Sequence, residues 1–155
     1  MSDTIETALN EQGIILPKAA APVASYVPAV EVNGLLYISG QVSMAEGKLV
    51  TGRLGENMSI EDGQEAAKAC ALMIAAQIKA FAGSLDRVDR IVKLGAFVNS
   101  TPDFTDHPKV ANGCSDMIEV IFGKAGIHAR SAVGVAALPL GVAVEVDAIV
   151  ALKPS

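Results

Sequence analysis

The sequence has few of the residues that mark metal, disulfide or nucleotide chemistry. Its 155 residues include only two cysteines, Cys70 and Cys114, and only two histidines. Neither a disulfide framework nor a zinc site is expected from so few ligands, and buried free thiols are the simplest interpretation. The 14 glycines form no GxGxxG or P-loop pattern. We therefore expect no metal and no cofactor.

Basic residues and long apolar runs are also scarce. Lysine and arginine number 12 against 17 aspartates and glutamates, which gives a net charge of −5. A phosphate backbone would be repelled and no basic face is visible, so we expect no nucleic-acid partner. No uncharged apolar run reaches about 18 residues, so we expect no membrane span. The first residues, MSDTIETALNEQG, are acidic and polar, unlike a secretory signal peptide, and a cytoplasmic protein is expected.

Apolar residues, in contrast, make up 51% of the chain, and the excess is alanine, valine and isoleucine. The mean hydropathy of +0.41 is high for a soluble monomer. Either the core is very dry, or a second surface is buried between subunits. We favour the second explanation, because obligate subunit interfaces resemble a protein core cut in half.

The first 24 residues are expected to form a helix and a connector ahead of a single domain over residues 25–155. A helix is predicted over residues 3–12, with Ser2 or Asp3 as its N-cap. The two prolines that follow favour an extended connector.

Two β-rich segments, 25–32 and 35–42, flank Asn33-Gly34, which is a strong signal for a hairpin. The glycine-rich stretch 45–57 is predicted to be a loop with a short strand near its middle.

The middle of the chain has helical periodicity. A helix is predicted over residues 59–83, capped by Ser59, with an apolar face of Cys70, Ile74, Ile78 and Phe81. A strand is predicted over residues 90–99. A second helical region starts at residue 101, begins again at Pro108 and runs to about residue 123.

The closing stretch, residues 128–152, is predicted to be a hairpin of two strands joined at residues 138–141. If Ala137 faces Val142, one face of this hairpin is uniformly apolar and belongs under the helices. The other face combines small residues with three charged ones: Arg130, Glu145 and Asp147. The element order is then β-β-α-β-α-β-β, an α+β fold with two helices on one side of a mixed sheet.

The charged face of this hairpin has two interpretations. Arg130 could hold a planar anion, because its guanidinium fork matches a carboxylate. It could equally form a structural ion pair with Asp147 or Glu145. The predicted register separates Arg130 from Glu145 by roughly 13 Å. One ligand could touch both residues only through the reach of the arginine, through a different register, or in a site shared between subunits.

The same stretch resembles the closing signature of the Rid family of reactive intermediate deaminases, also called the YjgF or L-PSP family. The resemblance covers about residues 25–152, and its motifs are ARSAV at 129–133, ALPLGVAVEVDAIVAL at 137–152, GLLYISGQV at 34–42, Tyr26, Phe104 and Asn112. It implies a chorismate-mutase-like subunit in a homotrimer, whose three sheets close into a barrel with a cleft at each interface. The cysteine common two residues after the family arginine is Ala132 here, and an aromatic often found after the asparagine is Ser115.

The resemblance also implies a reaction, the hydrolysis of a small 2-imino acid or its enamine to a 2-keto acid and ammonia. In deaminating members the family arginine, here Arg130, holds the substrate carboxylate. The other residues implied to line the cleft are Tyr26, Ser39, Gly40, Asn112 and Glu145. Glu145 near a bound water could transfer the protons. Two alternatives remain open: a non-catalytic trimeric binder of small carboxylates or keto acids, and a ribonuclease or translation inhibitor, which the acidic charge disfavours.

Overall fold

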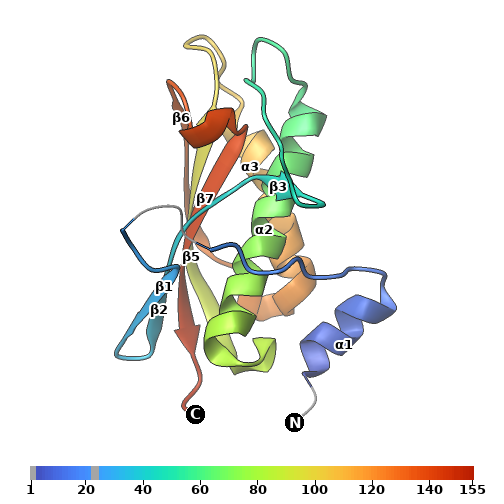
Figure 1. Cartoon of the computed structure of the whole chain (residues 1–155), viewed down its shortest axis with the longest axis vertical. Helices are drawn as coiled ribbons and strands as arrows, with labels where there is room; N and C mark the ends of the chain where they lie inside the picture. Colours follow the sequence, from blue (N-terminus) through green and yellow to red (C-terminus); the bar gives the residue numbers. More distant parts are fainter. Residues whose placement is uncertain (1–2, 22–24) are drawn as a thin grey trace.

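The computed structural model describes residues 3–21 and 25–155 (Figure 1). The helices are α1 (Thr4–Glu11), α2 (Ile60–Ala82) and α3 (His107–Phe122), with short 3-10 turns η1 (Leu85–Arg87), η2 (Gly123–Gly126) and η3 (Pro139–Gly141). The strands are β1 (Ala29–Val32), β2 (Leu35–Val42), β3 (Met44–Ala45), β4 (Lys48–Leu49), β5 (Val88–Asn99), β6 (Ala129–Val135) and β7 (Val144–Leu152). The predicted α+β class is confirmed.

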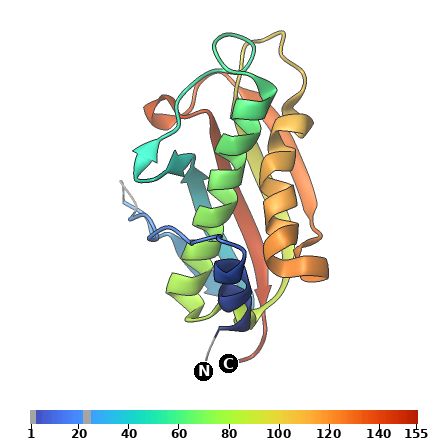
Figure 2. The same cartoon turned by 90° about the vertical axis from the view of Figure 1, so that its right-hand side faces the viewer.

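The main sheet has the strand order β1-β2-β7-β5-β6, and α2 and α3 lie side by side against one of its faces (Figure 2). Helix α2 contacts β2 and β7, whereas α3 contacts β5 and β6. Ser59 caps α2 by accepting a hydrogen bond from the backbone N–H of Asp62, and Gly83 ends the helix in a left-handed conformation, as predicted. On the predicted apolar face of α2, Phe81 is an exception, with 45% of its surface exposed.

The first two strands form the hairpin that Asn33-Gly34 predicts. Both turn residues have positive φ, 51° and 80°, as a two-residue type I′ turn requires. The register of β2 against β7 shifts between Ile38 and Gln41, because three steps along β2 match two steps along β7. This irregularity is a β-bulge at Ser39-Gly40.

Helix α1 is capped by Asp3, as predicted, and the alternative cap Ser2 lies outside the described residues. The carboxylate of Asp86, from η1, accepts hydrogen bonds from the backbone N–H groups of Thr4 and Ile5. Burial raises the pKa of Asp86, but these hydrogen bonds outweigh it and the pKa lies below its ordinary value. The chain after α1 runs across α2 towards the sheet (Figure 1).

The prediction that the last two strands form a hairpin is wrong. Strand β6 pairs in parallel with β5, and β7 lies on the other side of β5, antiparallel to both β5 and β2. Residues 136–143 therefore cross the end of β5 rather than making a tight turn. The parallel β5–β6 pair needs a long crossover, which α3 supplies. The second helix also begins later than predicted, at His107, and residues 101–106 form turns and irregular structure.

In this topology the side chains of β6 lie on the faces of the sheet opposite to those predicted. Arg130 stands opposite Leu94 of β5, and Leu94 stands opposite Ala148 of β7 on the buried, helix-covered side. Glu145 stands opposite Phe97, on the side without helices. The prediction that Arg130 and Glu145 share one face of the sheet is therefore wrong, whereas the open-face position of Glu145 and Asp147 is confirmed.

The open face of the sheet carries apolar side chains from three strands. Val30 and Val32 of β1, Tyr37 of β2 and Val133 of β6 are each between 46% and 52% exposed. Several half-exposed apolar residues on one face are typical of a surface that a partner covers.

Two features are absent from the described part of the chain. No helix there is long and apolar enough to cross a membrane. No group of three or more His, Cys, Asp or Glu side chains in that part is placed to hold a metal ion.

The closest approach of α2 and α3 predicts a stability effect. A Cβ at Gly113 would collide with the backbone carbonyl of Gln64. Gly113→Ala gains about 1 kcal/mol of helix propensity, but it forces the two helices apart. We expect a net loss of about 2 kcal/mol in the free energy of unfolding, measured with urea. Val120→Ala, at an exposed position of the same helix, is the control and should change it by less than about 0.5 kcal/mol. A neutral or stabilising Gly113→Ala would contradict this packing.

Candidate functional site

Arg130 lies on the edge strand β6 and its guanidinium reaches helix α3. Its Nη1 donates to Asn112 Oδ1 at 2.9 Å and to Ser115 Oγ at 3.0 Å. Its Nη2 lies 3.4 Å from the backbone carbonyl oxygen of Pro108. The structure therefore brings together Arg130 and Asn112, two of the predicted site residues. Among the described residues Arg130 forms no ion pair, so the structural ion pair with Glu145 or Asp147 is not formed.

A chain of hydrogen bonds orients the side chain of Arg130. His128 Nδ1 lies within hydrogen-bond distance of the carbonyl oxygen of Gly126, so Nδ1 carries the proton when the ring is neutral. Nε2 of the same ring is then an acceptor, 2.8 Å from Ser115 Oγ. The serine hydroxyl donates to His128 and accepts from Arg130. This chain fixes the orientation of the guanidinium and leaves its remaining N–H groups for an anion.

Glu145 belongs to a different part of the molecule. It lines a cavity of about 540 Å³, which we call the Glu145 cavity, together with Tyr26, Gly40 and Leu140. The glutamate carboxylate lies against Gly40, where a Cβ would collide with Glu145 Oε2. Glycine is therefore required at the bulge to leave room for this carboxylate. Tyr26, Gly40 and Glu145 are the second group of predicted residues that the structure brings together.

Ser39 supports this second group. Its hydroxyl donates to the carbonyl oxygen of Val27 at 2.8 Å, and its backbone N–H donates to the carbonyl oxygen of Pro28 at 2.9 Å. Ser39 therefore fastens the segment that follows Tyr26 to the bulge. Its carbonyl oxygen accepts from Gln41 Nε2, and Gln41 in turn accepts from the buried Gln77 of α2.

The electrostatics of the open face raise the pKa of Glu145. Burial raises the pKa of Glu145 above its ordinary value, and the nearby carboxylate of Asp147 raises it further. Burial likewise raises the pKa of Asp147, although the backbone N–H of Gly95 and the charge of Lys93 oppose this. A carboxyl group with a raised pKa exchanges protons closer to neutral pH, as general acid–base catalysis requires.

The two cysteines are buried and unreactive by the same physics. Burial raises the pKa of Cys114 to about 12, against the opposing charge of Arg130. Burial also raises the pKa of Cys70, whose thiol points at the carbonyl oxygen of Val144. Their prediction as buried free thiols is confirmed.

Within one subunit the predicted site is thus divided in two. The Arg130 group comprises Arg130, Asn112, Ser115 and His128, on the helix side at the β6 edge. The Glu145 group comprises Glu145, Gly40 and Tyr26, with Glu145 on the open side of the sheet.

Ser115 and His128 were not among the predicted site residues. A signal for each was present in the sequence, because Ser115 follows Asn112 by three residues on one helix face, and His128 shares the strand parity of Arg130.

Comparisons with known proteins identify relatives over nearly the whole chain. Residues 6–151 match the family described as "YjgF/chorismate_mutase-like, putative endoribonuclease". Protein TCP17 of Trypanosoma cruzi is 50% identical over 154 residues, covering 98% of this chain and 96% of that protein. The 2-iminobutanoate/2-iminopropanoate deaminase of Dermatophagoides farinae is 31% identical, covering 90% and 95%.

Among solved structures, the protein Atu1372 of Agrobacterium tumefaciens, described as having unknown function, is similar with a TM-score of 0.88. It is 44% identical, and the match covers 96% of this chain and 93% of that one.

The raised pKa of Glu145 predicts the sign of a pH effect on stability. The folded state favours the protonated carboxyl, so it binds more protons than the unfolded state above about pH 4.5. The free energy of unfolding should therefore fall as pH rises through the interval between the ordinary and the raised pKa. Glu145→Gln should remove the part of this fall that Glu145 contributes and leave the part from Asp147, measured by urea unfolding of both proteins from about pH 4 to pH 7. Parallel curves for the two proteins would contradict the raised pKa.

The second cause of this shift can be tested separately. Asp147→Asn removes the neighbouring negative charge that raises the pKa of Glu145. The side-chain carboxyl carbon of Glu145, followed by NMR, should then titrate at lower pH than in the wild type. An unchanged midpoint would show that the two carboxylates do not interact.

Proposed function

This chain belongs to the YjgF/chorismate-mutase-like (Rid) family, and we propose that it hydrolyses small 2-imino acids and their enamines to 2-keto acids and ammonia. The observation that carries the proposal is an oriented guanidinium and a carboxyl group of raised pKa, which we assign as the carboxylate-binding half and the proton-transferring half of the site. Arg130 has an oriented guanidinium, and Glu145 has a carboxyl group with a raised pKa beside an open cavity. These are the two functions that this hydrolysis needs.

We propose further that the two halves meet between copies of the chain in a homotrimer. The apolar open face gives a reason for association, because covering its half-exposed valines and Tyr37 removes apolar surface from water. Arg130 lies at the β6 edge of the sheet, and the Glu145 group lies at the bulge of β2, near the opposite edge. When sheets close edge to edge around a threefold axis, the β6 edge of one copy meets the β2 side of the next.

In the proposed reaction Arg130 of one copy binds the substrate carboxylate with two parallel hydrogen bonds. This fixes the adjacent C=N carbon in front of Glu145 of the next copy. Ionised Glu145 takes a proton from a water molecule as the water oxygen attacks the protonated imine. Glu145 returns this proton to the nitrogen of the resulting carbinolamine. The C–N bond then breaks and ammonia leaves, while the hydroxyl group gives its proton to Glu145 and the C=O bond of the keto acid forms.

A second candidate is a non-catalytic trimer that binds small carboxylates or keto acids. It is supported by the same Arg130 group, together with Ala132 and Ser115, which replace residues common in the family. It differs from the enzyme in predicting Arg130-dependent ligand binding without turnover. We disfavour a ribonuclease, because the net charge of −5 would repel the RNA backbone.

Mixing two inactive variants tests the shared site directly. Arg130→Ala and Glu145→Gln should each lower kcat/KM for freshly generated 2-aminoacrylate by at least about 100-fold, measured as pyruvate formation. If each cleft takes one residue from either copy, random mixed trimers contain about one intact cleft in four. The mixture, unfolded and refolded together, should therefore recover about a quarter of the wild-type activity.

Each variant refolded alone is the control and should remain inactive. If the wild type is active but the mixture recovers no activity, both residues of a cleft come from one subunit. No acceleration by the wild type would contradict the enzymatic proposal and favour the binder.

A further inference from the structure

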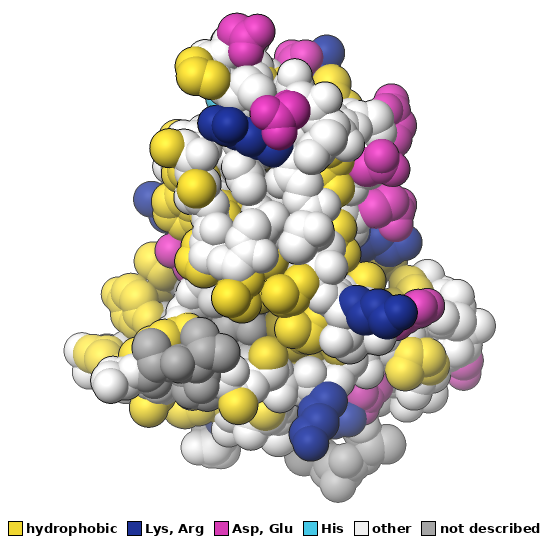
Figure 3. Space-filling view, turned by 45° about the horizontal axis from the view of Figure 1, so that its top comes forward, with side chains coloured by type: hydrophobic (Ala, Val, Ile, Leu, Met, Phe, Trp, Pro, Cys, Tyr) yellow, Lys and Arg dark blue, Asp and Glu magenta, His cyan; other side chains and the backbone are white. Residues whose placement is uncertain are grey.

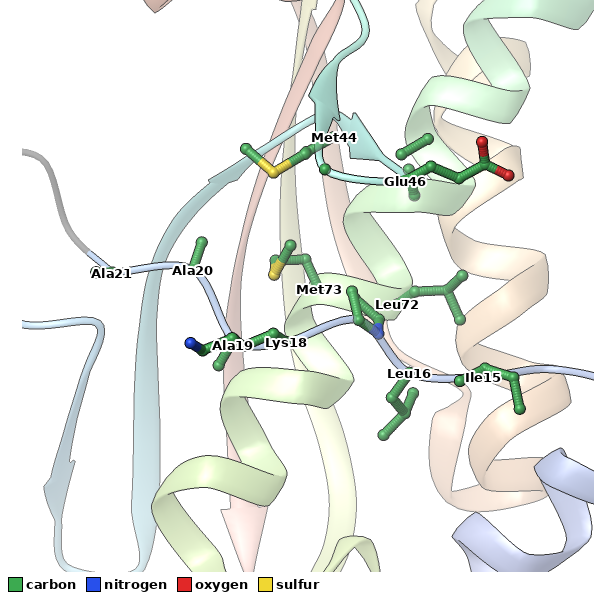
Figure 4. Close-up of a pocket in the computed structure, with 14 residues that line it drawn as sticks. Ile15, Leu16, Lys18, Ala19, Ala20, Ala21, Met44, Glu46, Leu72 and Met73 are labelled. Carbon is green, nitrogen blue, oxygen red and sulfur yellow. The ribbon is translucent and has the colours of Figure 1, made fainter.

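A second and larger hollow lies next to the Glu145 cavity. It has a volume of about 840 Å³ and is bounded by three segments: the connector at residues 15–21, the β3–β4 turn at residues 44–47, and α2 at residues 69–73. We call it the connector groove; Figure 4 shows its lining. In the space-filling view of Figure 3, hydrophobic side chains gather across the lower half of the visible face.

The connector groove and the Glu145 cavity are adjacent. They share four lining residues, Ala20, Ala21, Met44 and Met73. The thioether side chains of Met44 and Met73 project into the space between β3 and the connector (Figure 4). Methionine side chains are flexible and polarisable, so this junction can adapt to an apolar chain that passes through it.

The connector groove and the Glu145 cavity differ in the polarity of the residues that line them. The Glu145 cavity has polar lining groups, including Glu145, Tyr26 and Gln77. The connector groove is lined by alanine, leucine, isoleucine, proline and methionine, apart from Gly47 and two charged residues, Lys18 and Glu46. The carboxylate of Glu46 points away from Met44 and Met73 (Figure 4). A molecule that spans both spaces therefore has a polar head and an uncharged apolar tail.

We propose that the connector groove binds the apolar side chain of the substrate, so that the protein prefers 2-imino acids with long, uncharged side chains. The orientation rests on the proposed function, with the carboxylate at Arg130 of the neighbouring copy and the reacting carbon at Glu145. The side chain then extends past Met73 along the connector. A one-carbon side chain gains nothing from this groove, whereas each methylene buried in it strengthens binding by about fourfold.

Binding of stable product analogues tests the groove without requiring turnover. Isothermal titration calorimetry of the wild type should give a Kd for 2-oxooctanoate at least tenfold lower than that for pyruvate. Ala20→Phe places an aromatic ring at the junction, at a partly exposed position of the connector. It should abolish this preference by raising the Kd for 2-oxooctanoate to about that for pyruvate. The matched control is Ala80→Phe, at an exposed position of α2 that lines neither space.

The outcomes separate this inference from the proposed function. Equal affinity for the two keto acids, no binding of either, or a preference that persists in Ala20→Phe overturns the groove assignment. A change of oligomeric state in Ala20→Phe, seen by sedimentation, also overturns it, because a second copy would then occupy the groove. Turnover is measured in parallel on imines made from L-leucine by an amino acid oxidase. A preference for long side chains without turnover supports the groove assignment and contradicts the deaminase proposal. Turnover without this preference supports the deaminase proposal and contradicts the groove assignment.

Discussion

The parallel pairing of β5 with β6 is the constraint on which the site depends. It places β6 at the edge of the sheet and turns Arg130 towards α3, where Asn112 and Ser115 orient the guanidinium. An antiparallel β6–β7 hairpin would have put Arg130 and Glu145 on the same face. With the observed topology, the two charges are carried by opposite faces of one subunit. In the proposed reaction, Arg130 and Glu145 therefore act on one substrate only when copies of the chain assemble.

The other half of the site depends on a local irregularity in an otherwise regular strand. The bulge at Ser39-Gly40 interrupts the β2–β7 ladder and removes a side chain where the Glu145 carboxylate lies. Ser39 uses its hydroxyl and its backbone N–H to hold residues 27 and 28. Partial burial of Glu145 beside Asp147 then raises its pKa. Backbone geometry and low solvation together set the position of this carboxyl group and raise its pKa.

Local sequence signals predicted the local structure well. The Asn33-Gly34 turn, the Ser59 cap and the alternation along β7 all depend on near neighbours, and the structure confirms each. The pairing of β6 was not predictable in this way, because strands close in sequence usually form hairpins. Only the path of the chain over the end of β5 distinguishes the two topologies. Because side chains alternate along a strand, the wrong pairing predicted for β6 placed Arg130 on the wrong face of the sheet.

The candidate site was predicted as a set of residues but not as an arrangement. Arg130 with Asn112, and Glu145 with Gly40 and Tyr26, were assigned through resemblance to the family. Ser115 and His128 were missed because their part is to orient the arginine, which depends on the packing of α3 against β6.

The most direct test of a site shared between copies is a crystal structure of the protein with pyruvate. We expect a threefold assembly in which the pyruvate carboxylate contacts Arg130 of one copy and the keto carbon lies beside Gly40 and Glu145 of the next. An assembly in which Arg130 and Glu145 of neighbouring copies face different spaces, or pyruvate bound away from Arg130, would contradict it.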